Sequence, residues 1–344
     1  IIYLYYGCKK KINYHQLLCI WLLSMIILVF LMIMVGGLTR LTDSGLSITK
    51  WELFKGILPP LTKETWILYF NLYKEIPQFK LINPSMTMDE FKIIFYWEYF
   101  HRLLGRIIGL MYILPLIFFS LKMRLDKKTL YALYFIFFLI IFQGILGWYM
   151  VESGLSTNTT VSHYRLSLHL FFAFIIMSSL IWNYLNYKEN KKKIFFNLNN
   201  KLPKVLFILI LCQIIIGAFV SGLDAGLIYQ TWPKMNLSYY PDDINIANFD
   251  LIYLLNNQSF VQFLHRTIAY FIIAFTVLIG IKMIIDKQSK FLKNYLIVFF
   301  VLTAQVLLGI FTLVSGLNLY LASLHQITSV ILVFTVLNLN HKLS

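Results

Sequence analysis

Long apolar runs alternate along the chain with shorter polar segments. A helix needs about 20 residues to cross a bilayer core about 30 Å thick, and eight runs have close to that length. They cover approximately residues 16–37, 93–121, 130–151, 163–187, 203–222, 259–282, 294–314 and 320–339. The pattern predicts an all-α polytopic membrane protein with eight transmembrane helices.

The composition agrees with this prediction and excludes a water-soluble domain. The chain is 59% hydrophobic and 13% charged, with 30 Phe and 22 Tyr, which is far from the usage of soluble proteins. The three cysteines, Cys8, Cys19 and Cys212, are far apart and lie in or beside apolar runs. Their spacing indicates neither a disulfide framework nor a cysteine metal site, so we expect them to be core residues.

The cations are distributed unevenly over the two sides of the predicted membrane domain. Of 30 Lys and Arg residues, 18 fall on the side that carries both termini and the basic segments near 122–128, 188–204 and 282–293. The long loops 38–92 and 223–258 lie on the other side. The positive-inside rule places both termini in the matrix or cytoplasm. The first apolar run is long and has no small-residue cleavage site, which favours a retained anchor over a signal peptide.

The chain also repeats itself. WEYFHRLLGRIIGL at 97–110 resembles VQFLHRTIAYFIIA at 261–274, and SHYRLSLHLFFAF at 162–174 resembles LYLASLHQITSVILVF at 319–334. A Gln-x-x-x-Gly element recurs in 142–156, 212–226 and 304–318. These matches predict two pseudo-symmetric four-helix bundles, an N-terminal half at 1–187 and a C-terminal half at 205–344, joined by a basic linker at 188–204 on the inside.

Four histidines occupy matching positions in this repeat. His101, His169, His265 and His325 stand near the starts of the even-numbered helices, all of which begin outside, so they share one depth. Two imidazoles on facing helices can ligate the iron of a haem from both sides. We expect one haem between His101 and His169 and another between the other two. Zinc or copper would need further ligands, which the second half does not place. A single histidine here could merely be hydrogen-bonded at the interface, as we expect for His15, His163 and His341.

Four arginines lie within the predicted spans, where a charge is costly unless it is paired or functional. Arg165 precedes His169 by one turn and shares its face, so it is a candidate partner for a haem propionate. Arg102 and Arg266 directly follow their histidines, about 100° further around the helix. They are also candidates for cofactor binding, but a role with the backbone, a neighbouring helix or the other cofactor is equally open.

Glu98 stands three residues before His101, on nearly the same helix face. The second half has Gln262 at the equivalent position, which cannot move a proton, so the first half is the candidate for chemistry. The alternative is a structural ion pair between Glu98 and Arg102 at i, i+4 spacing.

The outer loops give three further signals. Thr87 and Glu90 form a capping-box pattern, which predicts that the second long helix begins outside the bilayer. Segment 62–80 is rich in aromatic residues and Lys, as in an amphipathic surface helix, although a solvated loop is an equal alternative. The glycine-rich segments 36–47 and 221–233 suit tight turns or close backbone approach to a bulky ligand.

The residues that carry these signals are similar to the haem A synthase family in its mitochondrial and alphaproteobacterial form. The similarity includes VGGLTRLTDSGLS, KGILPP, MTMDEFKIIFYWEYFHRLLGR, VSHYRLSLHL, VQFLHRTIAY and LASLHQ, in order, between about residues 16 and 339. The resemblance implies an eight-helix oxidoreductase that converts the C8 methyl of haem O to the formyl of haem A by successive hydroxylations. It also implies that His101 and His169 bracket the substrate haem beside the acid Glu98, while His265 and His325 hold haem b.

The resemblance further implies the surroundings of the protein. Haem O would come from a haem O synthase, electrons from an unidentified donor, and haem A would serve cytochrome c oxidase. Membrane lipid is a partner, a homo-oligomer is a further possibility, and nucleic acid is not expected. The family branch favours a mitochondrial inner membrane over a bacterial plasma membrane, and the outer loops lack the cysteine pairs of some members. Two other classes remain open, a dihaem b-type protein that exchanges electrons with quinone and a haem carrier without chemistry.

Overall fold

The fold is built from eight long helices. The computed structural model describes residues 14–344 apart from 53–54, 124, 157, 192, 194–200 and 245–249, so Cys8 lies outside the described residues. The long helices are α1 (Tyr14–Leu41), α4 (Met88–Lys122), α5 (Lys127–Leu155), α6 (His163–Lys188), α7 (Lys201–Gly222), α9 (Gln258–Ile285), α10 (Ser289–Val314) and α11 (Leu319–Leu343). Each is long and apolar enough to cross a membrane, and each contains one of the predicted runs. The prediction of an all-α, eight-helix membrane protein is confirmed.

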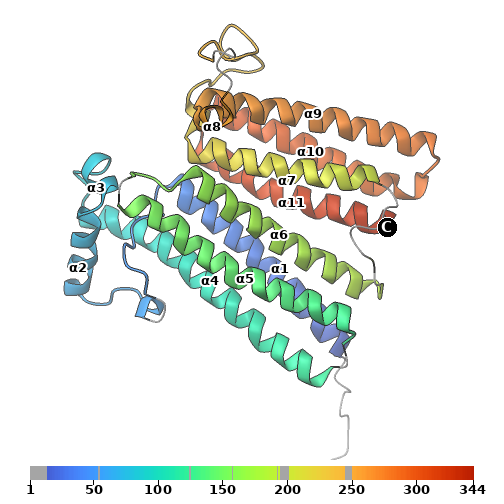
Figure 1. Ribbon diagram of the computed structural model, residues 1–344, viewed down its shortest axis with the longest axis horizontal. Helices are drawn as coiled ribbons and strands as arrows, with labels where there is room; N and C mark the ends of the chain where they lie inside the picture. Colours follow the sequence, from blue (N-terminus) through green and yellow to red (C-terminus); the bar gives the residue numbers. More distant parts are fainter. Residues whose placement is uncertain are drawn as a thin grey trace, which may run out of the picture.

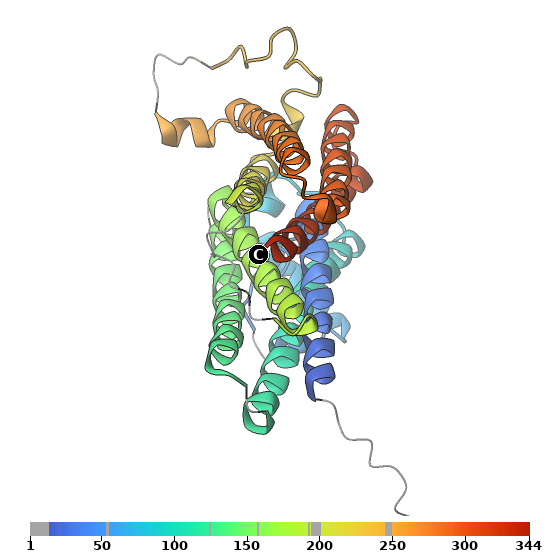
Figure 2. The same cartoon turned by 90° about the vertical axis from the view of Figure 1, so that its right-hand side faces the viewer.

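The helices form two groups that lie side by side. Helices α1, α4, α5 and α6 make one group and α7, α9, α10 and α11 the other (Figure 1). The groups meet where α6 packs on α7 and where α11 contacts α1 and α6, an arrangement also visible in Figure 2. Short helices mark the outer end: η1 (Lys55–Ile57), α2 (Lys63–Lys74), α3 (Pro77–Leu81), η2 (Ala225–Leu227) and α8 (Leu251–Asn256).

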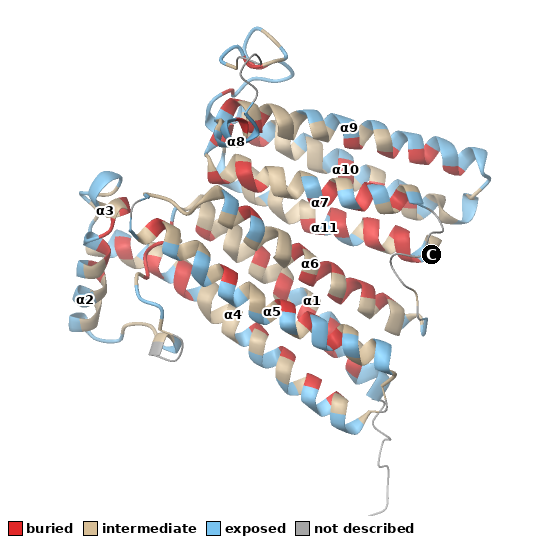
Figure 3. Ribbon diagram, viewed as in Figure 1, coloured by how far each residue is buried: buried red, intermediate tan, exposed pale blue. Residues whose placement is uncertain are grey.

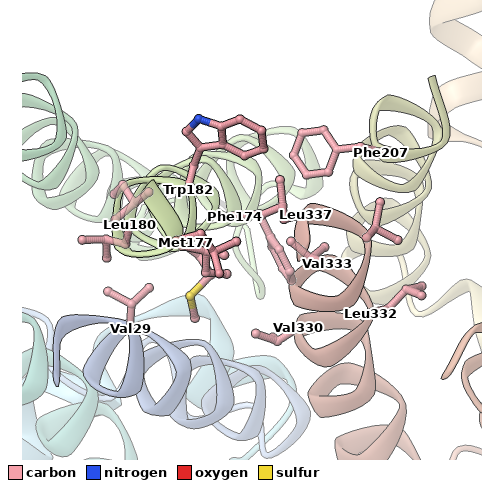
Figure 4. Close-up of a cluster of buried hydrophobic side chains, with 14 of the residues drawn as sticks. Val29, Phe174, Met177, Leu180, Trp182, Phe207, Val330, Leu332, Val333 and Leu337 are labelled. Atoms are coloured by element: carbon pink, nitrogen blue, oxygen red, sulfur yellow. The ribbon is translucent and has the colours of Figure 1, made fainter. Parts of the chain in front are cut away.

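The main core lies at the junction of the two groups. Apolar side chains from α1, α6, α7 and α11 interdigitate there, and Figure 4 shows Val29, Phe174, Met177, Phe207 and Val333 among them. Exposed residues lie mostly along the outer sides of α4, α5, α9 and α10 (Figure 3). Because lipid tails are as apolar as these side chains, their exposure is compatible with a bilayer, and close packing rather than water exclusion holds the helices together.

The outer segment before α4 forms a second, smaller core. Thr87 and Glu90 make both hydrogen bonds of a capping box, so α4 begins well before its apolar run, as predicted. Helix α2 lies against this extension, with Trp66 packed edge-on against Phe95 at 5.0 Å between ring centroids and Phe70 at 5.0 Å from Phe91. The segment 62–80 thus consists of α2 and most of α3, with a turn at Glu75 and Ile76 between them, and aromatic contacts fix α2 to α4.

One expectation about a single residue is wrong. Cys212 is exposed on the outer side of α7 rather than in the core, because its helix turns that face away from its neighbours. His341, in the last turn of α11, is fully buried within the protein. The end of α6 lies against the end of α11, so the His341 Nε2 lies 3.1 Å from Asn186 Oδ1 and its ring 5.1 Å from that of Trp182.

Candidate functional site

The structure brings the four repeat histidines together in the two predicted pairs. Each lies within the first four turns of its helix, on α4, α6, α9 and α11, at the end of the molecule that carries α2, α3 and α8. The rings of His101 and His169 are close enough to interact electrostatically, and so are those of His265 and His325. Each group of four long helices therefore contains one pair of neighbouring histidines.

Each of these four rings is in close contact with a glycine of a neighbouring helix. A Cβ atom on that glycine would lie between 2.8 and 3.2 Å from the histidine Cε1. The pairs are Gly36 with His101, Gly147 with His169, Gly217 with His265 and Gly309 with His325. Any side chain larger than hydrogen would displace the ring, so the four glycines set where the imidazoles stand.

The ring nitrogens have few partners within the protein. The Nδ1 atoms of His101, His169 and His265 are buried and have no hydrogen bond to any described residue. His325 Nδ1 donates to the Gln305 carbonyl oxygen at 3.0 Å, which leaves its Nε2 as the nitrogen with a lone pair for a ligand. Buried polar atoms without partners are rare in native proteins and usually indicate a ligand or water that completes them.

These features fit a haem. Among the described residues no group of three or more His, Cys, Asp or Glu side chains is placed to hold a lone metal ion. Two facing imidazoles supply only two ligands, and the four equatorial nitrogens of a macrocycle would complete the coordination of iron. The donor set therefore suits a planar cofactor better than zinc or copper.

A glutamine precedes three of the four glycines by one helical turn. Gln143 donates from Nε2 to the His169 carbonyl at 2.9 Å, and Gln213 does the same to the His265 carbonyl at 2.9 Å. The amide of Gln213 also lies 3.4 Å from His265 Nε2, and that of Gln305 lies 3.5 Å from His325 Nε2. These glutamines tie His169, His265 and His325 to the helix that carries the neighbouring glycine.

Glu98 is a buried anion whose oxygens are all occupied. Its side chain accepts hydrogen bonds from Ser47 Oγ at 2.7 Å and the Ile48 amide at 2.8 Å, and from Arg102 Nε and Nη2 at 3.0 and 2.6 Å. Only 2% of the residue is exposed. The ion pair that was the alternative interpretation is therefore present within α4, and the hydrogen bonds from Ser47 and Ile48 fasten the segment after α1 to this helix.

The second half makes the corresponding contacts without an anion. Gln262 donates from Nε2 to the Tyr229 carbonyl at 2.9 Å, and Arg266 donates to the carbonyls of Tyr229 and Thr231 at 2.8 and 2.9 Å. Arg102 likewise donates to the Ile48 carbonyl at 2.8 Å. Ile48 and Tyr229 are equally far along the chain from Gly36 and Gly217, so both arginines hold equivalent loops.

Arg165 differs from these two arginines. Its Nη1 donates to the Tyr149 carbonyl at 2.6 Å, and its guanidinium stands 3.7 Å from the centroid of the Tyr149 ring. The side chain thus lies against the end of α5, one turn outside His169.

Two polar contacts that the sequence did not indicate join the halves near these sites. Arg40 forms ion pairs with Asp43 and Asp224, both at 2.8 Å. Burial raises the pKa of the Asp43 carboxyl, and the nearby negative charge of Asp224 raises it further. The positive charge of Arg40 lowers it, but the pKa of Asp43 stays above its ordinary value. Gln326, next to His325, donates to the Ile33 carbonyl of α1 at 2.7 Å.

Gly37 makes the contact with Gln326 possible. A Cβ atom there would lie 1.5 Å from Gln326 Oε1, so no side chain fits. Since Gly36 contacts His101, adjacent residues of α1 touch a histidine of the first half and the neighbour of a histidine of the second half.

Comparison with known proteins gives a consistent result. Residues 19–337 match the family model described as cytochrome oxidase assembly protein. A protein of Pelagibacter ubique named haem A synthase is 49% identical over 93% of this chain and 94% of its own length. A haem A synthase of Flavobacterium psychrophilum is 41% identical over 94% and 97%, and one of Rhizobium rhizogenes is 40% identical over 89% and 84%.

Proposed function

The chain belongs to the cytochrome oxidase assembly protein family, together with relatives named haem A synthases, and we propose that it is an enzyme that makes haem A from haem O. The observation that supports this most directly is the duplicated arrangement of two imidazoles, each against its own glycine, at one end of an eight-helix membrane protein. One such pair suits a substrate haem and the other a resident haem.

The first half is proposed to hold haem O between His101 and His169, and the second half haem b between His265 and His325. A haem bound in these positions supplies the oxidising and electron-transfer chemistry. The helices supply orientation, because each imidazole is fixed by a glycine contact. They also supply a site surrounded by apolar side chains, from which water is largely excluded.

Glu98 is proposed as the acid of the substrate site. Only the first half has a carboxylate at this position, since the second half has Gln262. Its hydrogen bonds to Ser47 and Ile48 place the loop after α1 over the outer end of the first half. Glu98 would thus hold this loop in place and supply a titratable group within one turn of His101.

Arg102, Arg165 and Arg266 are proposed partners of the haem propionates. A guanidinium carries five N–H donors, and the carbonyl and carboxylate acceptors in the structure use only some of them. All three lie toward the outer end of the helices, where propionates can reach water.

The remaining features of the proposal concern the surroundings of the enzyme. It would take haem O from a haem O synthase, receive electrons from a donor of unknown identity, and supply haem A to cytochrome c oxidase. The relatives named above are all bacterial, which favours a bacterial plasma membrane over the mitochondrial inner membrane expected from the resemblance. The positive-inside rule keeps both termini on the inner side.

Pigment extraction from the purified protein tests the function. Haem O and haem A together with haem b are expected; haem b alone would instead indicate a dihaem electron carrier. In the Glu98→Gln variant, haem b should stay bound while haem A formation is lost, and unchanged turnover would reject an acidic role. In the His265→Ala variant, haem b should be absent, and retention with normal redox behaviour would remove His265 as a ligand.

A further inference from the structure

Two glycines line an open space in the seam between α4 and α5, which run side by side in the first half (Figure 1). A Cβ atom on Gly109 or on Gly144 would meet no atom of a neighbouring element within 4 Å. The seam is marked by the rings of Tyr112 and Phe137, which stack across the two helices with 6.2 Å between their centroids. Gly109 precedes Tyr112 by three residues and Gly144 follows Phe137 by seven. Because residues at these spacings share a helix face, both glycines face the seam.

This space lies directly inward of the first pair of histidines. Gly147, whose Cβ position is 3.2 Å from the His169 Cε1, lies one turn further out on α5 than Gly144. At the inner end, the Tyr112 hydroxyl donates to a carbonyl of α5 at 2.9 Å and closes the seam. On α4, the distance along the helix from His101 to Tyr112 is about 16 Å at the usual rise per residue.

The second half has the same seam between α9 and α10, but there it is filled. Its inner end is also closed by a tyrosine, since the Tyr295 hydroxyl donates to a carbonyl of α9 at 3.0 Å. The repeat puts Ile273 at the position of Gly109 and Val306 at that of Gly144. Both side chains are partly buried and pack against the main core. The two halves therefore differ in the space that they leave beside their histidines.

The usual roles of glycine in a membrane helix do not account for this pair. Small residues let two helices approach closely, but at both positions a Cβ would fit without touching the neighbouring helix. Gly109 and Gly144 also lie within regular α-helix, away from any turn. Glycine lowers the stability of a helix relative to alanine, so what the two glycines contribute is the space itself.

We propose that this space holds the hydroxyethylfarnesyl chain of haem O, and that Gly109 and Gly144 thereby select the substrate of the first half. The buried Nδ1 atoms of His101 and His169 have no partner among the described residues, which indicates a ligand at the outer end of the space. A chain attached to that ligand continues inward between the two helices. Gly144 is exposed, so the seam opens to the lipid, where the end of an isoprenoid chain is soluble.

Haem b lacks the isoprenoid chain and needs no such space, which agrees with the filled seam of the second half. The inference rests on the proposed function and adds to it the residues that distinguish the two haems. Bulk in the seam should therefore affect the binding of haem O and leave that of haem b unchanged.

Exchanging side chains between the halves tests the inference. The purified Gly109→Ile, Gly144→Val double variant, with haem b in its second half, is titrated with haem O and separately with haem b, and binding to the first half is followed by absorption. Haem O should bind about tenfold more weakly than to wild type, as expected for overpacking, while haem b binds as it does to wild type. Ala274→Leu is the control, because it adds bulk on the exposed side of α9; it should leave both titrations unchanged.

Unchanged binding of haem O to the double variant, or an equal loss for haem O and haem b, would overturn the inference. If the double variant loses the haem b of its second half, the reverse exchange decides instead. Ile273→Ala with Val306→Ala should let the second half take up haem O, which the wild-type second half excludes, and continued exclusion would overturn the inference.

Failure of the proposed function is a separate result. A protein whose first half binds haem O, and loses it when the seam is filled, but which forms no haem A would reject the enzyme and leave the role of the glycines intact. A protein that forms haem A equally well with a filled seam would keep the enzyme and reject that role.

Discussion

Replacing Glu98 by glutamine should destabilise the outer part of the first half strongly. The carboxylate accepts four hydrogen bonds, two of them from Arg102, and is 2% exposed. In the variant, one oxygen becomes an NH₂ group that meets donors on either side. At least one buried donor then loses its acceptor, which costs about 1–3 kcal/mol, and the Arg102 guanidinium loses its counter-charge.

The magnitude follows from the burial of both partners. The side chains of Glu98 and Arg102 are 3% and 11% exposed, and removing one partner of a buried pair typically costs about 3–5 kcal/mol. Arg102 keeps its bond to the Ile48 carbonyl, so we expect the lower end, about 3 kcal/mol in the free energy of unfolding. Arg102→Met should cost a similar amount, because it leaves Glu98 charged and buried.

A double-mutant cycle measures the pair directly. The free energy of unfolding is measured by chemical unfolding in detergent for Glu98→Gln, Arg102→Met and the double variant. The decrease in the double variant should be smaller than the sum of the two single decreases by about 3 kcal/mol. Asp89→Asn is the control, since its pair with Lys92 lies on the same helix with side chains 90% and 37% exposed; it should cost no more than about 1 kcal/mol. Additive single losses would refute the idea that the charges of Glu98 and Arg102 stabilise each other.

Two further predictions concern other parts of the chain. Gly309→Ala should displace His325, because the new Cβ would lie 2.9 Å from the histidine Cε1, and should lower the haem b content measured by absorption. Gly144→Ala is the control, since a Cβ there meets nothing within 4 Å, and it should retain the haem b. Equal haem b content in the two variants would contradict a role for the Gly309 contact. Burial raises the pKa of Glu189, but hydrogen bonds from Lys191 and Lys342 and the nearby positive charges lower it to about 2. Because this pKa lies below the ordinary value of about 4.3, the ionised Glu189 should stabilise the fold fully above about pH 4.3, and this stabilisation should be lost as the pH falls toward 2. The unfolding midpoints of wild type and Glu189→Gln should therefore converge between these two pH values. A constant difference would exclude the ion pairs as the cause.

Hydropathy was sufficient to predict the membrane helices, because each apolar run must satisfy its backbone within a helix of limited length. The repeat was sufficient to predict which histidines pair, since His101 and His169 match His265 and His325 in their surroundings. The Gln-x-x-x-Gly element was visible in the sequence, but its contact with histidine was not, because a motif on one helix does not indicate which helix packs against it.

The partners of the arginines depend on loop conformation, which periodicity does not encode. Arg102 and Arg266 donate to carbonyl groups of irregular segments, and the path of those segments includes left-handed residues at Asp43 and Asp224. These positions are equivalent in the two halves. The Asp at both was the one feature of the sequence that could have indicated a similar turn in the two segments. The ion pairs of Arg40 with Asp43 and Asp224 could not be predicted, because the sequence does not show that the segments after α1 and α7 lie side by side.

The consecutive glycines of α1 fix the spacing between the two proposed haem positions. Gln326 lies so close to Gly37 that α11 cannot slide along α1 without a collision. On the other side of α1, Gly36 is in close contact with the ring of His101. An electron that crosses from one half to the other would therefore travel a path whose length is set by a rigid seam of backbone, insensitive to the thickness or fluidity of the surrounding lipid.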